Sequence, residues 1–313
     1  MTGISATVLQ AIGNTPLVAL RRVVPEGCAR IVVKVEGHNP TGSMKDRMAQ
    51  AMVAGAERDG RLKPGGTIVE YTGGSTGASL ALVAAAKGYR LKIVSSDAFS
   101  AEKLTQMRAF GAALTLVPSE GGKITRKLIQ DMIAAAKAIA AEPDTYWTDQ
   151  LSNRDSIAGY HPMGEEIWAQ TGGRVDAFVQ AVGTMASLQG VAAVLKRNNP
   201  RTRIVAVEPG ESAVLSGGAP GAHRIEGIGI GAVPPMWTPS LVDEIIPVPT
   251  DAAEAMARRL AREEGLFAGT SSGANVLAAM QVGLRLGPAA TVATLLVDSG
   301  LKYLSTPLYK NAA

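Results

Sequence analysis

The chain has 313 residues, which is long enough for one large domain or two ordinary domains with a hydrophobic core. Its net charge is +4, it has no dense basic run, and 4% of its residues are aromatic, so the composition argues against a nucleic-acid partner. No stretch approaches the roughly 18 apolar residues of a membrane-spanning helix, and the N-terminus lacks a signal-peptide pattern. We therefore expect a cytoplasmic protein that contacts no membrane.

Segments typical of strands and of helices alternate along the chain, which predicts an α/β fold with parallel sheets covered by helices. The predicted strands are short and apolar throughout, as in strands buried on both faces. We predict strands at 30–36, 67–71, 90–95, 113–117, 175–182, 203–209, 242–248 and 291–297. We predict helices at 45–60, 76–88, 100–111, 187–198 and 251–265, and long loops at 142–156 and 209–237. A boundary between two sheets is expected near residue 145.

Residues 39–47 read Asn-Pro-Thr-Gly-Ser-Met-Lys-Asp-Arg, a loop that leads into a helix. Ser43 is the expected N-cap, which leaves Lys45 in the first turn, where the helix dipole disfavours a cation. A lowered pKa would make Lys45 a neutral, nucleophilic amine that can form a Schiff base. The alternative from the local sequence is that Lys45 only hydrogen-bonds the loop.

Four junctions are rich in Gly, Ser and Thr, and we expect each to follow a predicted parallel strand. They lie at 72–77, 183–187, 269–274 and 298–300. Loops of this kind, at the carboxyl ends of strands, can bind an anion with their backbone N–H groups. Pyridoxal phosphate would match both features, because it has an aldehyde for a lysine and a phosphate for such a loop.

Other common chemistries are not supported. The single cysteine, Cys28, excludes an internal disulfide and is expected to be structural. His38, His161 and His223 are scattered without the spacing of metal ligands, so we expect no metal site. The sequence also lacks a P-loop and the G-x-S-x-G motif of serine hydrolases.

Motifs along nearly the whole chain resemble a known family. They are IGNTPL (12–17), KVEGHNPTGSMKDR (34–47), VEPGESAVLSGG (207–218), IEGIGIGAVP (225–234), EGLFAGTSSGA (264–274) and DSGLKYLST (298–306). They resemble the cysteine synthase and cystathionine β-synthase family of fold type II pyridoxal phosphate enzymes. The resemblance implies two doubly wound, mostly parallel sheet domains of the tryptophan synthase β-like architecture. It implies a smaller domain at 35–145, a larger domain from 1–34 plus 146–313, an active site in the cleft between them, and a homodimer.

The resemblance also implies roles for individual residues. Lys45 matches the Schiff-base lysine, and Ser75 lies where the family has an asparagine that contacts the 3′-oxygen of the cofactor ring. Ser299 matches the serine that faces the pyridine nitrogen, and we expect the adjacent Asp298 to serve folding. The predicted phosphate loop consists of Gly183, Thr184, Met185, Ala186 and Ser187. The predicted substrate-binding residues are Thr72, Gly73, Gly74, Thr76, Gln150 and Gly227.

Two loops depart from the family pattern. The family's T-S-G-N-T-G has Gly73 and Ser75 at its second and fourth positions here, and G-T-G-G-T has Met185 and Ala186 at its third and fourth. We expect the smaller residues to leave a roomier substrate pocket, and Met185 to cost conformational freedom.

The implied reaction is a β-replacement on a serine-derived amino acid, with O-acetylserine and sulfide giving cysteine. One alternative is β-elimination, as in a cysteine desulfhydrase or a serine dehydratase. Another is β-replacement with a different donor or thiol, as in cystathionine β-synthase. A non-enzymatic alternative is a sensor that binds the cofactor or a metabolite without turnover.

Overall fold

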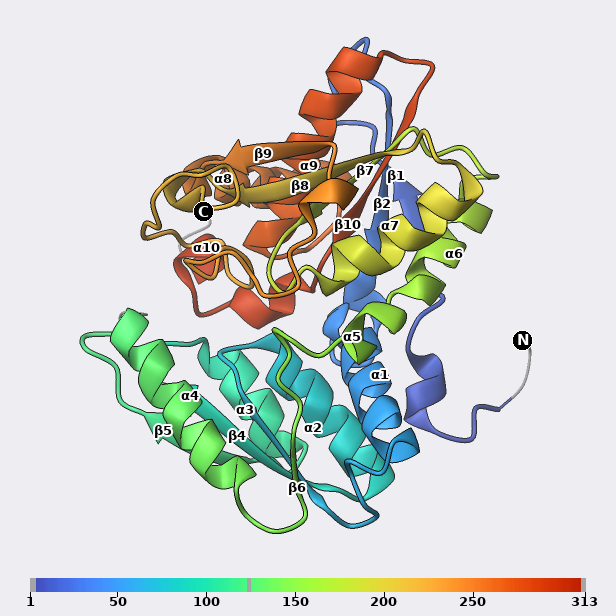
Figure 1. The fold of residues 1–313 in the computed structure, drawn as a ribbon. Helices are drawn as coiled ribbons and strands as arrows, with labels where there is room; N and C mark the ends of the chain where they lie inside the picture. The colour runs from blue at the N-terminus through green and yellow to red at the C-terminus, as the bar shows by residue number, and fades with distance from the viewer. Residues whose placement is uncertain (1–3, 123–124, 311–313) are drawn as a thin grey trace.

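The computed structural model describes residues 4–122 and 125–310, and within them the chain forms two helix-covered sheets (Figure 1). The larger sheet has the strand order β1 (Leu17–Ala19), β2 (Arg30–Val35), β10 (Thr291–Leu296), β7 (Ala177–Ala181), β8 (Arg203–Pro209) and β9 (Glu244–Val248). The smaller sheet has the order β5 (Ala113–Val117), β4 (Arg90–Ser96), β3 (Thr67–Tyr71) and β6 (Thr145–Trp147). Every pairing is parallel except that of β1 with β2, which confirms the predicted fold class.

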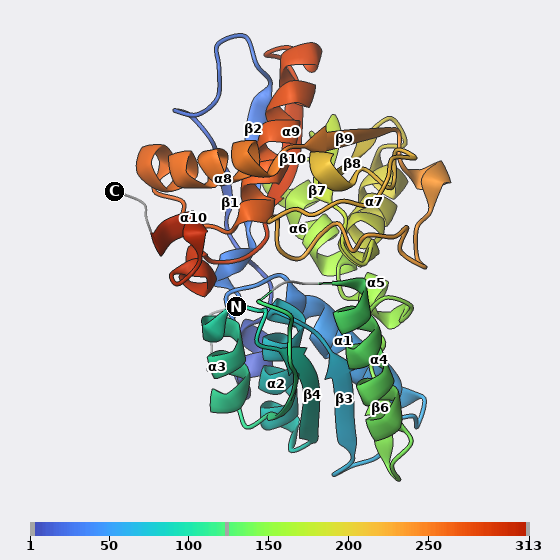
Figure 2. The ribbon, with the colours of Figure 1, turned by 90° about the vertical axis from the view of Figure 1, so that its left-hand side faces the viewer.

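The helices flank both sheets. They are α1 (Lys45–Arg58), α2 (Ser75–Lys87), α3 (Ala101–Ala109), α4 (Arg126–Ala140), α5 (Asp155–Ala158), α6 (His161–Gln170), α7 (Ala186–Asn198), α8 (Thr250–Arg259), α9 (Thr270–Leu286) and α10 (Pro307–Lys310). Short helical turns occur at η1 (Val8–Ala11), η2 (Glu36–His38), η3 (Gly210–Ser212), η4 (Pro239–Leu241), the π-helical η5 (Leu260–Glu264) and η6 (Gly300–Tyr303). Figure 2 shows α2 and α3 on one side of β3 and β4, with α4 on the other.

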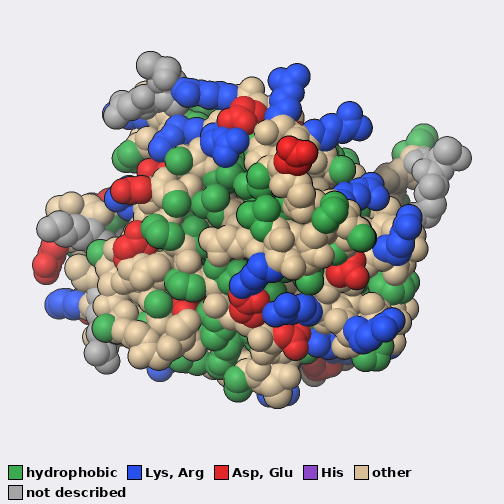
Figure 3. All heavy atoms as spheres, turned by 90° about the horizontal axis from the view of Figure 1, so that it is seen from above, with side chains coloured by type: hydrophobic (Ala, Val, Ile, Leu, Met, Phe, Trp, Pro, Cys, Tyr) green, Lys and Arg blue, Asp and Glu red, His purple; other side chains and the backbone are tan. Residues whose placement is uncertain are grey.

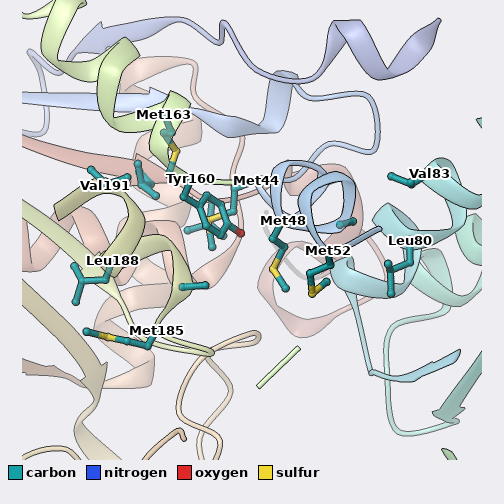
Figure 4. Packing of buried hydrophobic residues seen from close by; sticks show 14 of the residues in the cluster. Met44, Met48, Met52, Leu80, Val83, Tyr160, Met163, Met185, Leu188 and Val191 are labelled. Carbon is teal, nitrogen blue, oxygen red and sulfur yellow. The ribbon is translucent and has the colours of Figure 1, made fainter. Parts of the chain in front are cut away.

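One hydrophobic cluster joins the two halves of the molecule. It contains Met48 and Met52 of α1, Leu80 of α2, and Tyr160 and Leu188 from the region of α6 and α7. Figure 4 shows Met48 and Met52 on α1, with Tyr160 and Leu188 to one side of this helix and Leu80 to the other. Because α1 begins at Lys45, this packing holds the start of the helix against both halves.

The predicted strands and helices lie close to the observed ones, but β1, α4, α6 and α10 were not predicted, and three expectations about particular segments were wrong. The segment 142–156, expected to be a loop, contains β6 and α5. The strand β5 is mostly exposed because it lies at a sheet edge, whereas β7 and β10 are buried along their whole length, as expected. Segment 269–274 follows no strand, because α9 begins at Thr270 directly after a loop.

The surface is consistent with the composition. On the face seen in Figure 3, Lys and Arg side chains are interspersed with Asp and Glu. No helix among the described residues is long and apolar enough to cross a membrane. Cys28 is buried, as expected for a structural cysteine.

Candidate active site

Lys45 lies beside the carboxyl end of β10. The loop before it pairs with that strand end through Met44 N–H to Val297 O at 2.9 Å and Ser299 N–H to Gly42 O at 2.9 Å. The expected N-cap at Ser43 was wrong by one residue: Met44 is the N-cap, and α1 begins at Lys45. The Ser43 hydroxyl still accepts a hydrogen bond from the Lys45 N–H at 3.2 Å, so it satisfies a donor of the first turn.

Asp46 fixes this loop to α2. Its buried carboxylate accepts hydrogen bonds from Thr41 N at 2.8 Å, from Thr41 Oγ1 at 2.5 Å and from Ser79 Oγ at 2.6 Å. Burial raises the pKa of Asp46, and the bonds from Ser79 and Thr41 oppose that rise. The residue after the candidate nucleophile is therefore held by three hydrogen bonds, two from the loop before α1 and one from α2.

Lys45 has the properties of a nucleophilic amine. Burial lowers its pKa to about 8, with the charge of Asp298 acting upward and that of Lys103 acting downward. We expected the helix dipole to lower this pKa, but burial is the largest cause. Lys302 also has a pKa of about 8 for the same main reason, yet its Nζ donates to Gln106 Oε1 at 2.7 Å. No described residue makes such a bond with Lys45 Nζ, so this amine is free to react.

The predicted phosphate loop connects β7 to α7. The backbone N–H groups of Thr184, Met185 and Ser187 have no acceptor among the described residues. Gly183 packs against the chain at Gly227, since a Cβ on Gly183 would lie 2.4 Å from Gly227 O. Unpaired backbone N–H groups at the start of a helix, in a loop that begins with a glycine, are suited to bind a phosphate.

Met185 has the conformational cost that we predicted. Its φ of 75° is in the left-handed region, which is unusual for a residue with a side chain. The side chain is 1% exposed and packs in the core near Leu188 (Figure 4). The loop is thus held in a strained backbone conformation by hydrophobic packing.

The predicted substrate loop at 72–77 connects β3 to α2. The N–H groups of Gly73, Ser75 and Thr76 lack acceptors within the described part of the chain. Thr76 Oγ1 donates to Gln150 Oε1 at 2.7 Å, so the structure joins two residues that were predicted from separate motifs. Glu70 accepts from Gln150 N at 3.0 Å and thereby supports the second of them.

The pocket is not roomier at Gly73, contrary to our expectation. A Cβ on Gly73 would lie 2.1 Å from the ring of Phe99. The aromatic ring, which follows β4, takes the space that the family's serine would need. Gly73 therefore packs directly against Phe99, a contact that the loop motif alone could not reveal.

The end of β10 presents Asp298 and Ser299 in different directions. The Ser299 hydroxyl accepts from Leu301 N–H at 3.3 Å and caps η6. The carboxylate of Asp298 is 4% exposed and accepts a hydrogen bond from Ser75 Oγ at 3.3 Å. The contact between Asp298 and Ser75 was not predicted, because no local motif links two residues 223 positions apart.

Three further polar residues, for which no role was predicted from the sequence, surround Asp298. Lys103 of α3 forms an ion pair with Glu226, and its Nζ lies 4.3 Å from the centre of the Tyr303 ring. Tyr303 Oη donates to Asp298 Oδ2 at 2.8 Å. The sequence predicts a helix at 100–111 but gives no role to Lys103, which the tertiary fold brings to this place.

Segment 269–274 supports the site rather than adding a fourth anion loop. Ser272 Oγ accepts from Val297 N–H at 2.9 Å, and Thr270 Oγ1 accepts from Glu226 N–H at 3.2 Å. No cluster of possible metal ligands occurs among the described residues. The arrangement of a reactive amine, two loops with unpaired donors and a buried carboxylate fits pyridoxal phosphate.

Comparisons with known proteins agree with this arrangement. A family model for pyridoxal-phosphate dependent enzymes matches residues 8–298. A cysteine synthase of Staphylococcus aureus is 43% identical over 304 residues, which cover 96% of each chain. A cysteine synthase structure from Entamoeba histolytica is 40% identical with a TM-score of 0.92, over 100% of this chain and 93% of that chain. A hydrogen sulfide-producing enzyme from Fusobacterium nucleatum is 34% identical with a TM-score of 0.89, over 97% and 99%. The chain therefore belongs to the cysteine synthase and cystathionine β-synthase family of pyridoxal-phosphate dependent enzymes.

Proposed function

We propose that the protein converts O-acetylserine and sulfide into cysteine and acetate by pyridoxal phosphate-dependent β-replacement. The cysteine synthases among its relatives support this pair of substrates. The observation that carries the proposal is Lys45, an unbonded amine with a pKa of about 8 beside loops that have unpaired N–H groups. A non-catalytic sensor of the cofactor could use the same amine, but its visible chromophore would not change when an amino acid is added.

In this proposal Lys45 holds the cofactor covalently, and Ser75 lies near the 3′-oxygen of its ring. The bound cofactor supplies an electron sink for the bonds at the substrate's α-carbon. The phosphate is held by Gly183, Thr184, Met185, Ala186 and Ser187. The substrate is held by Thr72, Gly73, Gly74, Thr76, Gln150 and Gly227, with its carboxylate on the N–H groups of the 72–77 loop.

The reaction needs one proton to leave the α-carbon and later return. Lys45, released as a free amine, removes this proton, and its pKa of about 8 suits a base that works near neutral pH. The bond from the β-carbon to acetate then breaks and acetate leaves with the electron pair. Sulfide forms the new bond at the β-carbon, and Lys45 returns the proton to the α-carbon.

We also propose the domain division that the sequence predicted, 35–145 and 1–34 plus 146–313, with substrate entering the cleft between the two. The working form in this proposal is a cytoplasmic homodimer. Sedimentation equilibrium of the purified protein tests the assembly, since a monomer at micromolar concentration would contradict it.

The activity is tested by offering the purified holoprotein O-acetylserine, O-phosphoserine, serine and cysteine in turn, with and without sulfide. We expect cysteine only from O-acetylserine with sulfide. Lys45→Ala should abolish the reaction, whereas Lys63→Ala should not, because Lys63 is exposed and forms a surface ion pair with Asp144. Cysteine formation by Lys45→Ala at the wild-type rate would contradict the proposal.

A second candidate is β-elimination, which the hydrogen sulfide-producing relative supports. It differs in that no nucleophile adds at the β-carbon, so cysteine and water would give pyruvate, ammonia and sulfide. Pyruvate from cysteine alone, at a rate above that of cysteine formation from O-acetylserine, would replace the first proposal with this one.

A further inference from the structure

Glu70 is a fully buried carboxylate at the end of β3. Its Oε2 accepts hydrogen bonds from Thr148 Oγ1 at 2.5 Å and from Gln150 N–H at 3.0 Å. Its Oε1 accepts from Tyr71 N–H at 2.9 Å and from Trp147 Nε1–H at 3.4 Å. Three of these donors belong to the end of β6 and the turn after it. One side chain therefore connects the ends of two neighbouring parallel strands (Figure 2).

Glu70 has no cationic partner among the described residues, so its hydrogen bonds alone stabilise the carboxylate. Burying a charged group is costly unless such bonds satisfy it. Burial raises the pKa of Glu70 to about 7, while the bonds from Thr148 and the other donors act downward. Donors on both oxygens require a group that only accepts. A glutamine cannot replace it, because half of its amide is a donor.

Oε2 of Glu70 holds both neighbours of a strained residue. Asp149 lies between Thr148 and Gln150 and has a φ of 42°, in the left-handed region that residues with a side chain seldom adopt. Such a conformation persists only where the surrounding contacts fix it. Because Thr148 and Gln150 both donate to this one oxygen, the turn at Asp149 depends on Glu70.

The turn places Gln150 against the predicted substrate loop at 72–77. Gln150 Nε2 donates to Tyr71 O at 3.3 Å, and Gln150 Oε1 accepts from Thr76 Oγ1 at 2.7 Å. The side chain thus connects the end of β3 to the start of α2, beside the unpaired N–H groups of the loop. A shift of the turn would move Gln150 away from them.

We propose that Glu70 is a positioning residue for the amino-acid substrate: by holding the turn at Asp149, it places Gln150 where the substrate carboxylate binds. The inference rests on the proposed function, because it takes the loop at 72–77 as the carboxylate site. Glu70 contacts neither the substrate nor Lys45 in this role. Its loss should therefore weaken the binding of the amino acid and leave the proton transfer by Lys45 unchanged.

The test compares kcat and the KM for O-acetylserine at saturating sulfide, at about pH 8, where Glu70 is mostly ionised. Glu70→Gln should raise this KM about tenfold or more, because hydrogen bonds to a charged group are lost. Its kcat and its affinity for the cofactor should stay within about twofold of wild type. Thr148→Val removes one donor with little change of shape, and it should raise the KM about threefold.

Asp243→Asn is the control for a general loss of stability. Asp243 accepts from Ile204 N–H at 2.7 Å and pairs with Lys196 at 3.1 Å. These contacts lie where β8 and β9 begin, at the edge of the larger sheet opposite the strand ends that carry the site. Asp243→Asn should therefore leave the KM for O-acetylserine unchanged.

A Glu70→Gln protein whose KM stays within about twofold of wild type would overturn the inference, as would an equal rise of KM in Asp243→Asn. If Glu70→Gln does not fold, a Thr148→Val protein with the wild-type KM would overturn it alone. Each of these results leaves the proposed function intact, because O-acetylserine is still converted. Failure of the wild-type protein to convert O-acetylserine would instead refute the proposed function, and the inference with it.

Discussion

Replacing Glu166 by glutamine should destabilise the fold by weakening the ion pairs that attach α1 to α6. The Glu166 carboxylate accepts two hydrogen bonds of 2.8 Å from the guanidinium of Arg47, and it pairs with Lys34 at 2.6 Å. Burial raises the pKa of Glu166, but Arg47 and Lys34 outweigh burial and hold it at about 2, against 4.5 for an ordinary glutamate. At about 1.4 kcal/mol per unit, this difference corresponds to about 3 kcal/mol of folding free energy at neutral pH. Arg47 is the main partner, because burial lowers the pKa of Lys34 despite its contact with Glu166.

Because the pKa of Glu166 is depressed in the folded state, its contribution is fully present above pH 4.5 and is lost as pH falls toward 2. Urea unfolding at pH 7 should therefore show Glu166→Gln less stable than wild type by about 3 kcal/mol, and the gap should shrink between pH 4.5 and 2. Asp131→Asn is the control, since its pair with Lys127 is exposed and should contribute under about 1 kcal/mol. A Glu166→Gln loss no larger than the control, or one independent of pH, would refute the reasoning.

Three further changes test the candidate site. The rate of cofactor attachment should rise with pH through about 8, as Lys45 loses its proton, and a rate that is flat between pH 7 and 9 would contradict this pKa. Gly183→Ala should weaken cofactor binding about tenfold or more, because the new Cβ would lie 2.4 Å from a backbone oxygen. Gly210→Ala is the control and should be tolerated, because the nearest atom to its Cβ would be 3.4 Å away. Calorimetric titration with the cofactor compares the two variants. Gly73→Ser should lower the melting temperature, because the new side chain would clash with the ring of Phe99. Adding Phe99→Ala should restore the melting temperature. A Gly73→Ser variant that melts like wild type would show that the two positions are not coupled.

Much of the fold could be predicted because apolar runs and helical periods report burial directly. The strands 67–71, 113–117 and 203–209 have the predicted bounds. The missed strand β6 has three residues, which is too short to show a pattern, and its sequence is surrounded by loop-forming residues. The turn at Met44 and Lys45 differs from the prediction because Ser43 is engaged in a bridge with Asp298, a tertiary contact that capping preferences do not contain.

The candidate site was partly predictable for a different reason. Lys45 and the loops at 72–77 and 183–187 have local signals, namely a cation at a helix start and Gly-rich junctions after strands. The contact between Ser75 and Asp298 joins residues 223 positions apart, and no local pattern encodes it. The clash that ties Gly73 to Phe99 likewise depends on how β3 and β4 lie side by side.

The central claim is that Lys45 is the lysine that carries the cofactor. It is tested most directly by reducing the holoprotein with borohydride and locating the labelled lysine by peptide mass spectrometry. Lys302 is the informative competitor, because it is the other described lysine with a pKa of about 8, although its amine is already bonded to Gln106. We predict a label on Lys45 alone, and a label on Lys302 or on any other lysine would contradict this assignment.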